Sequence, residues 1–485
     1  MNYSEFLKMG PEIVLVLALV IMFVADFILH KKESKSKSLF SLMVALMVIS
    51  LCGTFCTVGS HSEPVSAFGG LYIATPAVNV MKSILVFGSL IVVLMAQPWV
   101  EKTQRLAGEF YMLLISTLLG MFVMMSSGNF LLFFLGLETA SVPLACMVAF
   151  DKWKQNSAEG AAKYILVATF SSGVMLYGIS FLYAATGTLY FDDVAATISA
   201  SPLTIMGLVF FFSGLGFKIS LVPFHFWTAD TYEGAPTPVT GYLSVISKGA
   251  AAITLCIILM KVFQPLVYYW EYMLYIVIVL SITVANLFAI RQSELKRFMA
   301  FSSISQAGYI MLAVVGNSQL GIASLTYYVL VYIVANMAVF TVINVVEHRA
   351  QPMANGQSLT AISAYNGFYQ TNPKLSFLMT LALFSLAGIP PFAGMFSKFF
   401  VFMAAAEQGS AAAYFVVFIA LVNTVISLYY YLLIVKAMYI TKTDTPLPTF
   451  KSDFNTKAAL AICTAGVALF GICSCIYEWI AAAGL

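Results

Sequence analysis

Long apolar segments separated by short polar ones run through the whole chain. Fourteen of them reach the length of about 20 residues that a helix needs to cross the apolar core of a bilayer. They cover residues 11–30, 39–59, 76–97, 109–127, 129–150, 159–186, 202–224, 237–262, 270–290, 297–315, 321–346, 375–405, 411–440 and 458–482. The pattern predicts an all-α polytopic membrane protein with fourteen transmembrane helices.

Basic residues are distributed unevenly between the two sides of these spans. All but six of the 24 lysines and arginines lie in or beside the loops that follow odd-numbered spans. The exceptions are Lys8 and Lys261 on the other side and Lys82, Lys218, Lys248 and Lys398 within spans. Loops rich in lysine and arginine stay on the cytoplasmic side of a membrane. The pattern therefore predicts that both termini lie outside the cytoplasm, which is the periplasm if the host is Gram-negative.

Composition narrows the chemistry that this chain can perform. Hydrophobic residues make up 61% and charged residues 9% of the sequence, whereas soluble domains carry about 25% charged residues. The seven cysteines and four histidines show no metal-binding spacing, and no glycine-rich nucleotide motif is present. We therefore expect no redox cofactor, nucleotide or metal site in this chain, and no binding to nucleic acid.

Two of the spans carry helix breakers beside a lysine. Pro223 follows Lys218 in the seventh span and should free the backbone carbonyl of Ile219, because proline has no N–H group. The twelfth span contains "SLAGIPPFAGMFSKFF", in which a glycine and two prolines precede Lys398. Broken helices are tolerated at membrane depth where they are buried in protein or line a wet cavity. We therefore predict that helices 7 and 12 are discontinuous.

The spacing of the two breaks suggests an internal repeat. They are five spans apart, which predicts two five-helix repeats, helices 4–8 and helices 9–13, and an odd number of helices makes such repeats inverted. The chain then divides into residues 1–108 (helices 1–3), 109–262 (first repeat), 263–440 (second repeat) and 441–485 (helix 14). In this alignment Glu138 corresponds to Gln306.

Four charged residues lie toward the middle of different spans, and we call them the charged row: Glu138, Lys218, Lys248 and Lys398. A charge at membrane depth is costly and usually functional. Burial disfavours a protonated lysine, whereas a nearby carboxylate favours it. A Glu–Lys pair that forms and separates would therefore make the lysine hold and release a proton. The alternative is a set of static ion pairs that fix helix packing.

Other polar positions have two interpretations each. His225 could extend a proton path toward the inner side or act as a structural hydrogen-bond donor. Lys82 could be functional, or it could serve packing or snorkel to the surface. Lys163 is expected to be a cytoplasmic anchor rather than a proton carrier. The remaining polar candidates could hold water or join helices: Ser244, Ser247, Ser302, Ser303, Ser305 and Gln306.

Several motifs resemble a known family. "GLGFKISLVPFHFWTADTYEGAPTPVT", "SVISKGAA", "ELKRFMAFSSISQAGYI" and "LAGIPPFAGMFSKF" are similar to the antiporter-like subunits of respiratory complex I, a family that includes membrane subunits of multisubunit cation/proton antiporters. The resemblance covers residues 109–440. Of three bacterial types, the L type is longer and the M type has glutamate at position 398. The length of 485 residues, fourteen spans and Lys398 resemble the third type.

The resemblance implies a proton-translocating, non-redox membrane subunit of NADH-quinone oxidoreductase. Glu138 and Lys218 match the family's fifth- and seventh-helix pair, Lys248 the central lysine of the eighth helix, and Lys398 the twelfth-helix residue. Relatives often have histidine where this chain has Gln306, and glutamine cannot titrate. The resemblance also implies FMN, iron–sulfur clusters and quinone in partner subunits. The implied neighbours are an M-like antiporter subunit and small K-, J- and A-type subunits.

Three alternative functions remain open at this point. A subunit of a sodium/proton antiporter would have the same fold and would work without a redox partner. A purely structural subunit would hold its charges in fixed ion pairs. A small-molecule permease would need one clustered polar pocket rather than a row of titratable groups.

Overall fold

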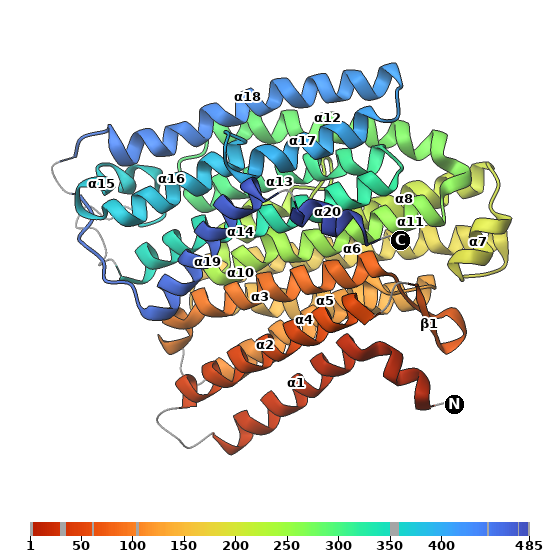
Figure 1. The fold of residues 1–485 in the computed structure, drawn as a ribbon, viewed down its shortest axis with the longest axis horizontal. Helices are drawn as coiled ribbons and strands as arrows, with labels where there is room; N and C mark the ends of the chain where they lie inside the picture. Colours follow the sequence, from red (N-terminus) through yellow and green to blue (C-terminus); the bar gives the residue numbers. More distant parts are fainter. Residues whose placement is uncertain are drawn as a thin grey trace.

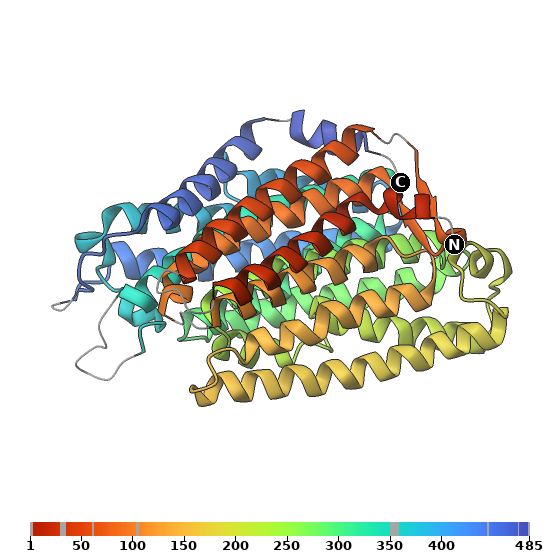
Figure 2. The same ribbon diagram turned by 90° about the horizontal axis from the view of Figure 1, so that it is seen from below.

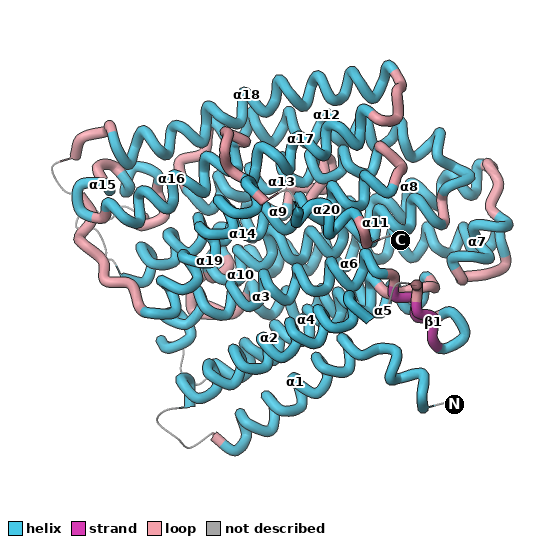
Figure 3. The backbone as a smooth tube through the Cα atoms, in the orientation of Figure 1, coloured by secondary structure: helices cyan, strands magenta, loops and turns pink. Residues whose placement is uncertain are grey.

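The computed structural model describes residues 3–29, 35–60, 63–102, 106–349, 358–443, 446–473 and 475–483, and these are almost entirely helical (Figures 1 and 3). The long helices are α1 (Gly10–Ile28), α2 (Lys35–Ser60), α3 (Pro76–Lys102), α4 (Ala107–Met125), α5 (Phe130–Val148), α6 (Gln155–Thr186), α8 (Pro202–Ile219), α11 (Lys248–Lys261), α12 (Val267–Ile290), α13 (Leu295–Val315), α14 (Gln319–Arg349), α16 (Pro373–Ala387), α17 (Ala393–Ala406), α18 (Ala411–Tyr439) and α19 (Phe454–Ile472). The short helices are η1 (Tyr3–Met9), η2 (Phe68–Gly70), α7 (Phe191–Thr197), α9 (Trp227–Gly234), α10 (Thr237–Tyr242), η5 (Gln264–Leu266), η6 (Ile362–Tyr365), α15 (Phe368–Thr371) and α20 (Cys475–Ala481).

The helices form one bundle, and the axes of the long helices lie roughly parallel or antiparallel to one another (Figures 1 and 2). Among the described residues, thirteen helical segments are long and apolar enough to cross a membrane. The pair α16 and α17 occupies the predicted twelfth span. Because the two marked ends of the chain, N and C, both lie in the right-hand half of Figures 1 and 2, the arrangement agrees with an even number of crossings. The predicted all-α polytopic fold is confirmed.

The basic residues Lys31, Lys32 and Arg105 lie outside the described residues.

Polar side chains mark where several helices begin. The hydroxyl of Ser201 accepts a hydrogen bond from the backbone N–H of Thr204, and the hydroxyl of Thr204 accepts one from the backbone N–H of Ser201, which forms a capping box at the start of α8. Asn129 caps α5 and Ser410 caps α18 in the same general way. Each side chain satisfies a backbone N–H group that has no partner within its helix.

The seventh span is broken, but its helix ends four residues before Pro223, the residue that was expected to break it. α8 ends at Ile219, and Ser220 adopts a left-handed conformation with φ 67°. The N–H of Leu221 then donates to the carbonyl of Gly216 at 2.9 Å, which closes the helix end. Pro223 therefore lies in the loop before α9 instead of interrupting the helix itself. The predicted discontinuity is present, and its immediate cause is the turn at Ser220.

The twelfth span breaks where the sequence predicts. α16 ends at Ala387, and Gly388 follows with φ 89°, a conformation that favours glycine. A Cβ atom at Gly388 would lie 3.2 Å from Cδ of Lys398. Pro390 and Pro391 follow, and α17 begins at Ala393. The glycine thus allows both the turn and the close approach of Lys398.

Three features depart from the predicted elements. The fourteenth span was predicted over 458–482, but α19 ends at Ile472 and Cys473 is extended, so α20 is a separate helix. A small antiparallel hairpin, β1 (Val65–Ala67) and β2 (Tyr72–Ala74), lies between α2 and α3. A π-helical turn (Leu243–Ser247) interrupts the eighth span directly before α11. These three features have short or ambiguous apolar patterns, which periodicity does not resolve.

The core of the bundle is formed by α13 and α14. Every residue of the most apolar 18-residue window in each of these helices is buried. Outer helices such as α1 and α6 instead expose large apolar side chains, including Phe27 and Phe170, as expected for helices that face lipid. A helix buried on all sides can carry polar groups only if other protein groups satisfy them. The polar residues on α13 therefore need hydrogen-bond partners from the helices packed around it.

Candidate functional site

Lys218 lies in the last turn of α8 and is 3% exposed. Its Nζ donates to the hydroxyl of Ser141 on α5 at 2.8 Å and to the hydroxyl of Tyr164 on α6 at 3.0 Å. It also lies 5.7 Å from the centroid of the Tyr164 ring, a distance at which a ring face attracts a cation. Three helices thus hold this ammonium group through neutral partners.

Glu138 lies on α5 and is partly buried. Its Oε1 accepts a hydrogen bond from Ser172 on α6 at 2.5 Å. No Glu138–Lys218 ion pair is present among the described residues. Ser141, which binds Lys218, is three residues after Glu138 and therefore on the same face of α5. The two members of the predicted pair are close in the fold and separated in this conformation.

Lys248 begins α11, directly after the π-helical turn, and is 2% exposed. Its Nζ donates to the hydroxyl of Ser303 on α13 at 2.7 Å and lies 5.4 Å from the centroid of the Tyr232 ring. The Ser303 hydroxyl in turn donates to the carbonyl of Ser244, within the π-helical turn, at 3.3 Å. π-helical turns are frequent at functional sites, and this one places Lys248 and Ser244 around the same serine.

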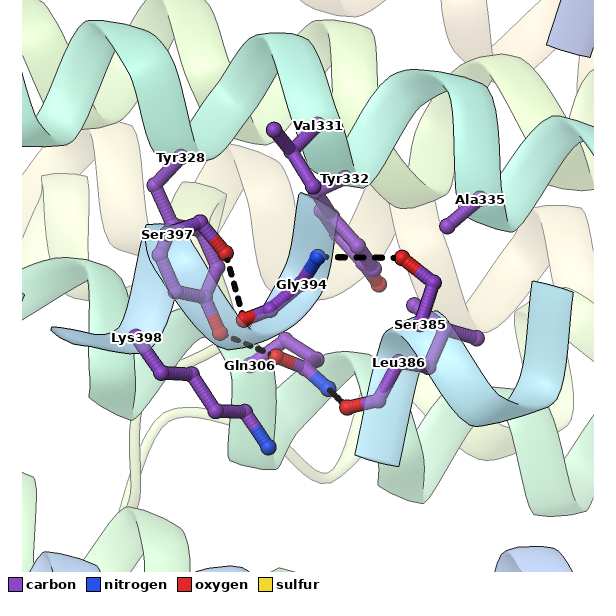
Figure 4. A pocket seen from close by; sticks show the side chains of 10 residues that line it. All are labelled: Gln306, Tyr328, Val331, Tyr332, Ala335, Ser385, Leu386, Gly394, Ser397 and Lys398. Carbon is purple, nitrogen blue, oxygen red and sulfur yellow. Dashed lines mark hydrogen bonds between the residues drawn. The ribbon is translucent and has the colours of Figure 1, made fainter. Parts of the chain in front are cut away.

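Lys398 lies one turn into α17 and is 4% exposed. Its Nζ donates to the carbonyl of Ala387 at the end of α16 at 3.0 Å, and it lies 4.9 Å from the centroid of the Tyr309 ring. The helix break therefore supplies the acceptor for this lysine. Beside it is a cavity of about 10 Å³ whose lining includes Gln306 and Ser397 (Figure 4), close to the size that one water molecule needs.

Gln306 connects four elements next to this cavity (Figure 4). Its Nε2 donates to the carbonyl of Leu386 on α16 at 3.3 Å and to the hydroxyl of Tyr431 on α18 at 3.2 Å. Its Oε1 accepts a hydrogen bond from Tyr328 on α14. The Tyr431 hydroxyl also lies 2.5 Å from the hydroxyl of Ser302 on α13. Gln306 is therefore part of a hydroxyl and amide network that reaches from α13 to the twelfth-span break.

His225 and Lys163 lie apart from the charged row. His225 is buried in the loop between α8 and α9 with its ring stacked on Phe226, and no hydrogen bond joins it to Lys218 or Lys248 among the described residues. Lys163 pairs with Asp230 on α9 at 2.5 Å. Arg297 on α13 also contacts Asp230, at 2.6 Å. This ionic cluster ties α9 to α6 and α13, and the cytoplasmic position of Lys163 stays a prediction.

Lys82 lies in a fully buried ion pair, so the snorkelling explanation is wrong. Its Nζ lies 2.6 Å from Oε1 of Glu12 on α1, and both side chains are at most 3% exposed. The hydroxyl of Tyr72, on β2, lies 3.2 Å from Nζ and 3.0 Å from Oε2 of Glu12. Glu12 was not among the residues predicted from the sequence. Its position in "GPEIVLVL", an acid at the edge of an apolar run, was the available indication.

Replacing Glu12 with glutamine is expected to destabilise the protein, because it leaves the Lys82 ammonium buried without a counter-charge. Loss of one partner of a buried pair costs about 3–5 kcal/mol. The measurement is the temperature at which half of the detergent-solubilised protein leaves its main size-exclusion peak, which should fall. The double variant Glu12→Gln/Lys82→Met should regain part of the loss. Exposed Glu63→Gln is the control, and equal midpoints for Glu12→Gln and the unmodified protein would contradict the expectation.

No group of three or more histidine, cysteine, aspartate or glutamate side chains among the described residues is arranged to hold a metal ion. The residues that converge are lysines, hydroxyls and amides instead. Such groups can bind and pass protons and can organise water. The arrangement therefore fits proton transfer across the bundle.

Comparison with known proteins shows the family of this chain. Residues 127–427 match the family described as NADH:quinone oxidoreductase/Mrp antiporter, transmembrane region. The chain is 54% identical to NADH-quinone oxidoreductase subunit N of Phocaeicola vulgatus, over 99% of this chain and 98% of the relative. It is 49% identical to the subunit N of Azobacteroides pseudotrichonymphae, with the same coverage.

Solved structures show the same fold. A chain of respiratory complex I from Thermus thermophilus is 28% identical and superposes with a TM-score of 0.82, over 98% of this chain and 100% of the other. A chain of the Mrp complex from Dietzia is 18% identical, with a TM-score of 0.84 over 98% and 97% of the two chains, and it shows the fold alone. The chain is therefore a multi-pass membrane protein that belongs to the NADH:quinone oxidoreductase/Mrp antiporter family and, within it, to the NADH-quinone oxidoreductase subunit N group.

Proposed function

We propose that this chain translocates protons within NADH-quinone oxidoreductase and that the charged row carries them. One observation supports this most strongly. Lys218, Lys248 and Lys398 are all buried, yet among the described residues none of them forms an ion pair. Lys82, by contrast, is fixed to Glu12. A buried lysine without a counter-charge can exchange its proton, whereas a paired one is held in its charged form.

Glu138 acts in this proposal as the switch for Lys218. In the described conformation Ser172 holds the carboxylate and Ser141 holds the ammonium. A rotation that brings the carboxylate toward Lys218 would favour the protonated lysine, and separation would favour proton release. A change of charge in a neighbouring subunit could bias Glu138 between these positions. Distant redox chemistry would reach the row in this way.

Between Lys218 and Lys248 the proposed proton path runs along aromatic side chains. Tyr164 packs against Trp227 with ring centroids 5.1 Å apart, and Trp227 packs against Tyr232, which faces Lys248. Nearby buried oxygens, Oγ1 of Thr228 and Oγ of Ser247, have no hydrogen-bond partner among the described residues. Buried polar atoms of this kind are usually satisfied by ordered water. Water at these positions would connect the two lysines.

Between Lys248 and Lys398 the proposed proton path runs through neutral side chains. The hydroxyl of Ser303 on α13 accepts a hydrogen bond from Lys248. The neighbouring Ser302 shares a hydrogen bond with the hydroxyl of Tyr431 on α18, and Tyr431 accepts another from Gln306, which lies on α13 like Ser302. Glutamine cannot titrate, so Gln306 would orient hydroxyls and water without itself accepting the proton. The cavity beside Gln306 (Figure 4) then gives a single water molecule access to Lys398. His225 could add an inner branch of this path.

Replacing Gln306 with leucine should slow proton translocation by roughly tenfold, because it leaves the Tyr328 and Tyr431 hydroxyls and the Leu386 carbonyl without their partner. Gln306→His restores hydrogen-bonding capacity and should retain most of the activity. The measurement is the initial rate of NADH-driven acidification inside proteoliposomes, normalised to assembled complex. Gln292→Leu, outside the network, is the control. Full activity in Gln306→Leu would remove Gln306 from the proposed path.

The remaining parts of the reaction would belong to other subunits. We infer that FMN, iron–sulfur clusters and the quinone site lie in partners, and that this chain is a non-redox subunit. Its proposed neighbours are an M-like antiporter subunit and small K-, J- and A-type subunits. The proposed location is the bacterial inner membrane, with the termini in the periplasm. The proposed division of the chain stays at 1–108, 109–262, 263–440 and 441–485.

A sodium/proton antiporter subunit is the second candidate, because a chain of an Mrp complex has the same fold. Purification of the tagged chain in mild detergent separates the two functions. Flavin and iron–sulfur absorbance together with NADH–quinone reductase activity would support the proposed function. A colourless complex of small membrane proteins would favour the antiporter.

A further inference from the structure

A large groove opens between α16 and α19, away from the charged row. Its volume is about 1040 Å³, and it lies at the end of the bundle where α15 and the segment before α19 are found (Figure 1). Three lysines line its mouth: Lys374 in the first turn of α16, Lys451 before α19 and Lys457 in the first turn of α19. Nothing in the proton path uses these groups.

The three lysines carry unbalanced positive charge. All three are exposed, and none forms an ion pair among the described residues. Asp453 lies between two of them in sequence but does not line the groove. The mouth therefore has a net attraction for an anion.

Below the lysines the groove becomes apolar. Leu375 and Leu378 on α16 and Leu460, Ala461 and Ala465 on α19 line it. From Lys457 to Ala465 the helix rises about 12 Å at 1.5 Å per residue, which extends from the charged mouth well into the depth of an acyl layer. The groove thus joins a cationic rim to an apolar floor, and this matches an amphiphile better than a free anion.

The rim is held in place by a buried amide. The Nδ2 of Asn372, which is 5% exposed, donates to the carbonyl of Pro448 at 2.9 Å, and its Oδ1 accepts from the N–H of Phe450 at 2.9 Å. The hydroxyl of Thr449 donates to the carbonyl of Thr371 at 3.3 Å. These bonds fasten the segment that carries Lys451 to the start of α16, so the lysines are presented by a fixed rim.

We propose that this groove binds an anionic phospholipid of the cytoplasmic leaflet, with its phosphate at Lys374, Lys451 and Lys457 and an acyl chain along α16 and α19. Basic pockets between transmembrane helices on the cytoplasmic side bind such headgroups, because several lysines attract one phosphate at short range. The apolar floor accounts for the tail. The placement of the groove in the cytoplasmic leaflet rests on the predicted orientation of the chain.

The test uses the whole complex in nanodiscs that contain phosphatidylglycerol with a photoreactive group in its tail. After illumination, peptides 371–380 and 457–468 should carry the label. An excess of unlabelled phosphatidylglycerol should displace it, whereas phosphatidylcholine or inorganic phosphate should not. Each lysine-to-glutamine change should weaken labelling roughly fivefold, and Lys442→Gln, exposed at the same end but outside the groove, should leave it unchanged.

Three outcomes would overturn the proposal. Equal labelling by a phosphatidylcholine probe would show an unselective acyl contact. Displacement by inorganic phosphate would show an anion site without a lipid. Absence of label in the assembled complex would show that a neighbouring subunit covers the groove. Labelling is measured without proton pumping, so failure here leaves the proposed function standing, and the reverse also holds.

Discussion

Replacing Lys218 with methionine is expected to abolish proton translocation through this chain while the subunit still assembles. Methionine fills a similar volume, and the lost partners, the hydroxyls of Ser141 and Tyr164, are neutral groups that water can satisfy. The change removes the group that takes up and releases the proton next to Glu138. Loss of a residue that transfers the proton itself slows that step by about 10²-fold or more. The measurement is NADH-driven proton uptake into proteoliposomes that contain equal amounts of assembled complex.

Lys218→Arg separates a transfer role from a packing role. Arginine keeps the positive charge but does not release its proton in proteins. A static role predicts that arginine restores function, whereas a transfer role predicts that pumping stays lost. Normal pumping in the methionine variant, or full rescue by arginine, would exclude Lys218 from the path.

Replacing Lys248 with methionine should have an effect of similar size, again about 10²-fold on the transfer step. Lys248 lies between the two halves of the proposed path, and its Nζ donates a hydrogen bond to the hydroxyl of Ser303. Ser303→Ala should have a weaker effect in the same direction, because the lysine remains but loses its orientation. Both variants are measured as quinone-reductase activity and as proton uptake in the same vesicles.

The control for this second prediction is Lys261→Met, at the far end of α11 and partly exposed beside Asp192. It removes a lysine from the same helix without touching the charged row. Equal losses in Lys261→Met and Lys248→Met would mean that the effect reflects the stability of α11. An unaffected Lys248→Met would mean that proton transfer bypasses α11.

Much of the fold follows from strong local patterns. The positions of the spans were predictable because a bilayer demands long apolar helices. The break at Gly388 was predictable because a glycine followed by two prolines allows few other conformations. The end of α8 at Ser220 was not predictable, since serine rarely adopts a left-handed conformation and only tertiary packing enforces it. The π-helical turn before Lys248 likewise depends on contacts with α13 and α14.

The candidate site was predictable in its charges but not in its partners. A lysine within an apolar span is visible in a sequence, so Lys218, Lys248 and Lys398 could be selected. Which serine, tyrosine or carbonyl each one meets depends on how distant helices pack. Lys82 shows the same limit, because Glu12 is 70 residues away and they meet only when α1 packs near α3. Sequence alone therefore could not separate a fixed lysine from a free one.

The most direct test of the relay compares initial proton-translocation rates of Lys218→Met, Lys248→Met and the double variant at equal amounts of assembled complex. Groups that act in one path are non-additive, because the first block already stops the flow. If both lysines act in one path, the double variant keeps the same residual rate as the slower single variant. Wild-type rates in the single variants, or a double variant slower by the product of the two single effects, would contradict it.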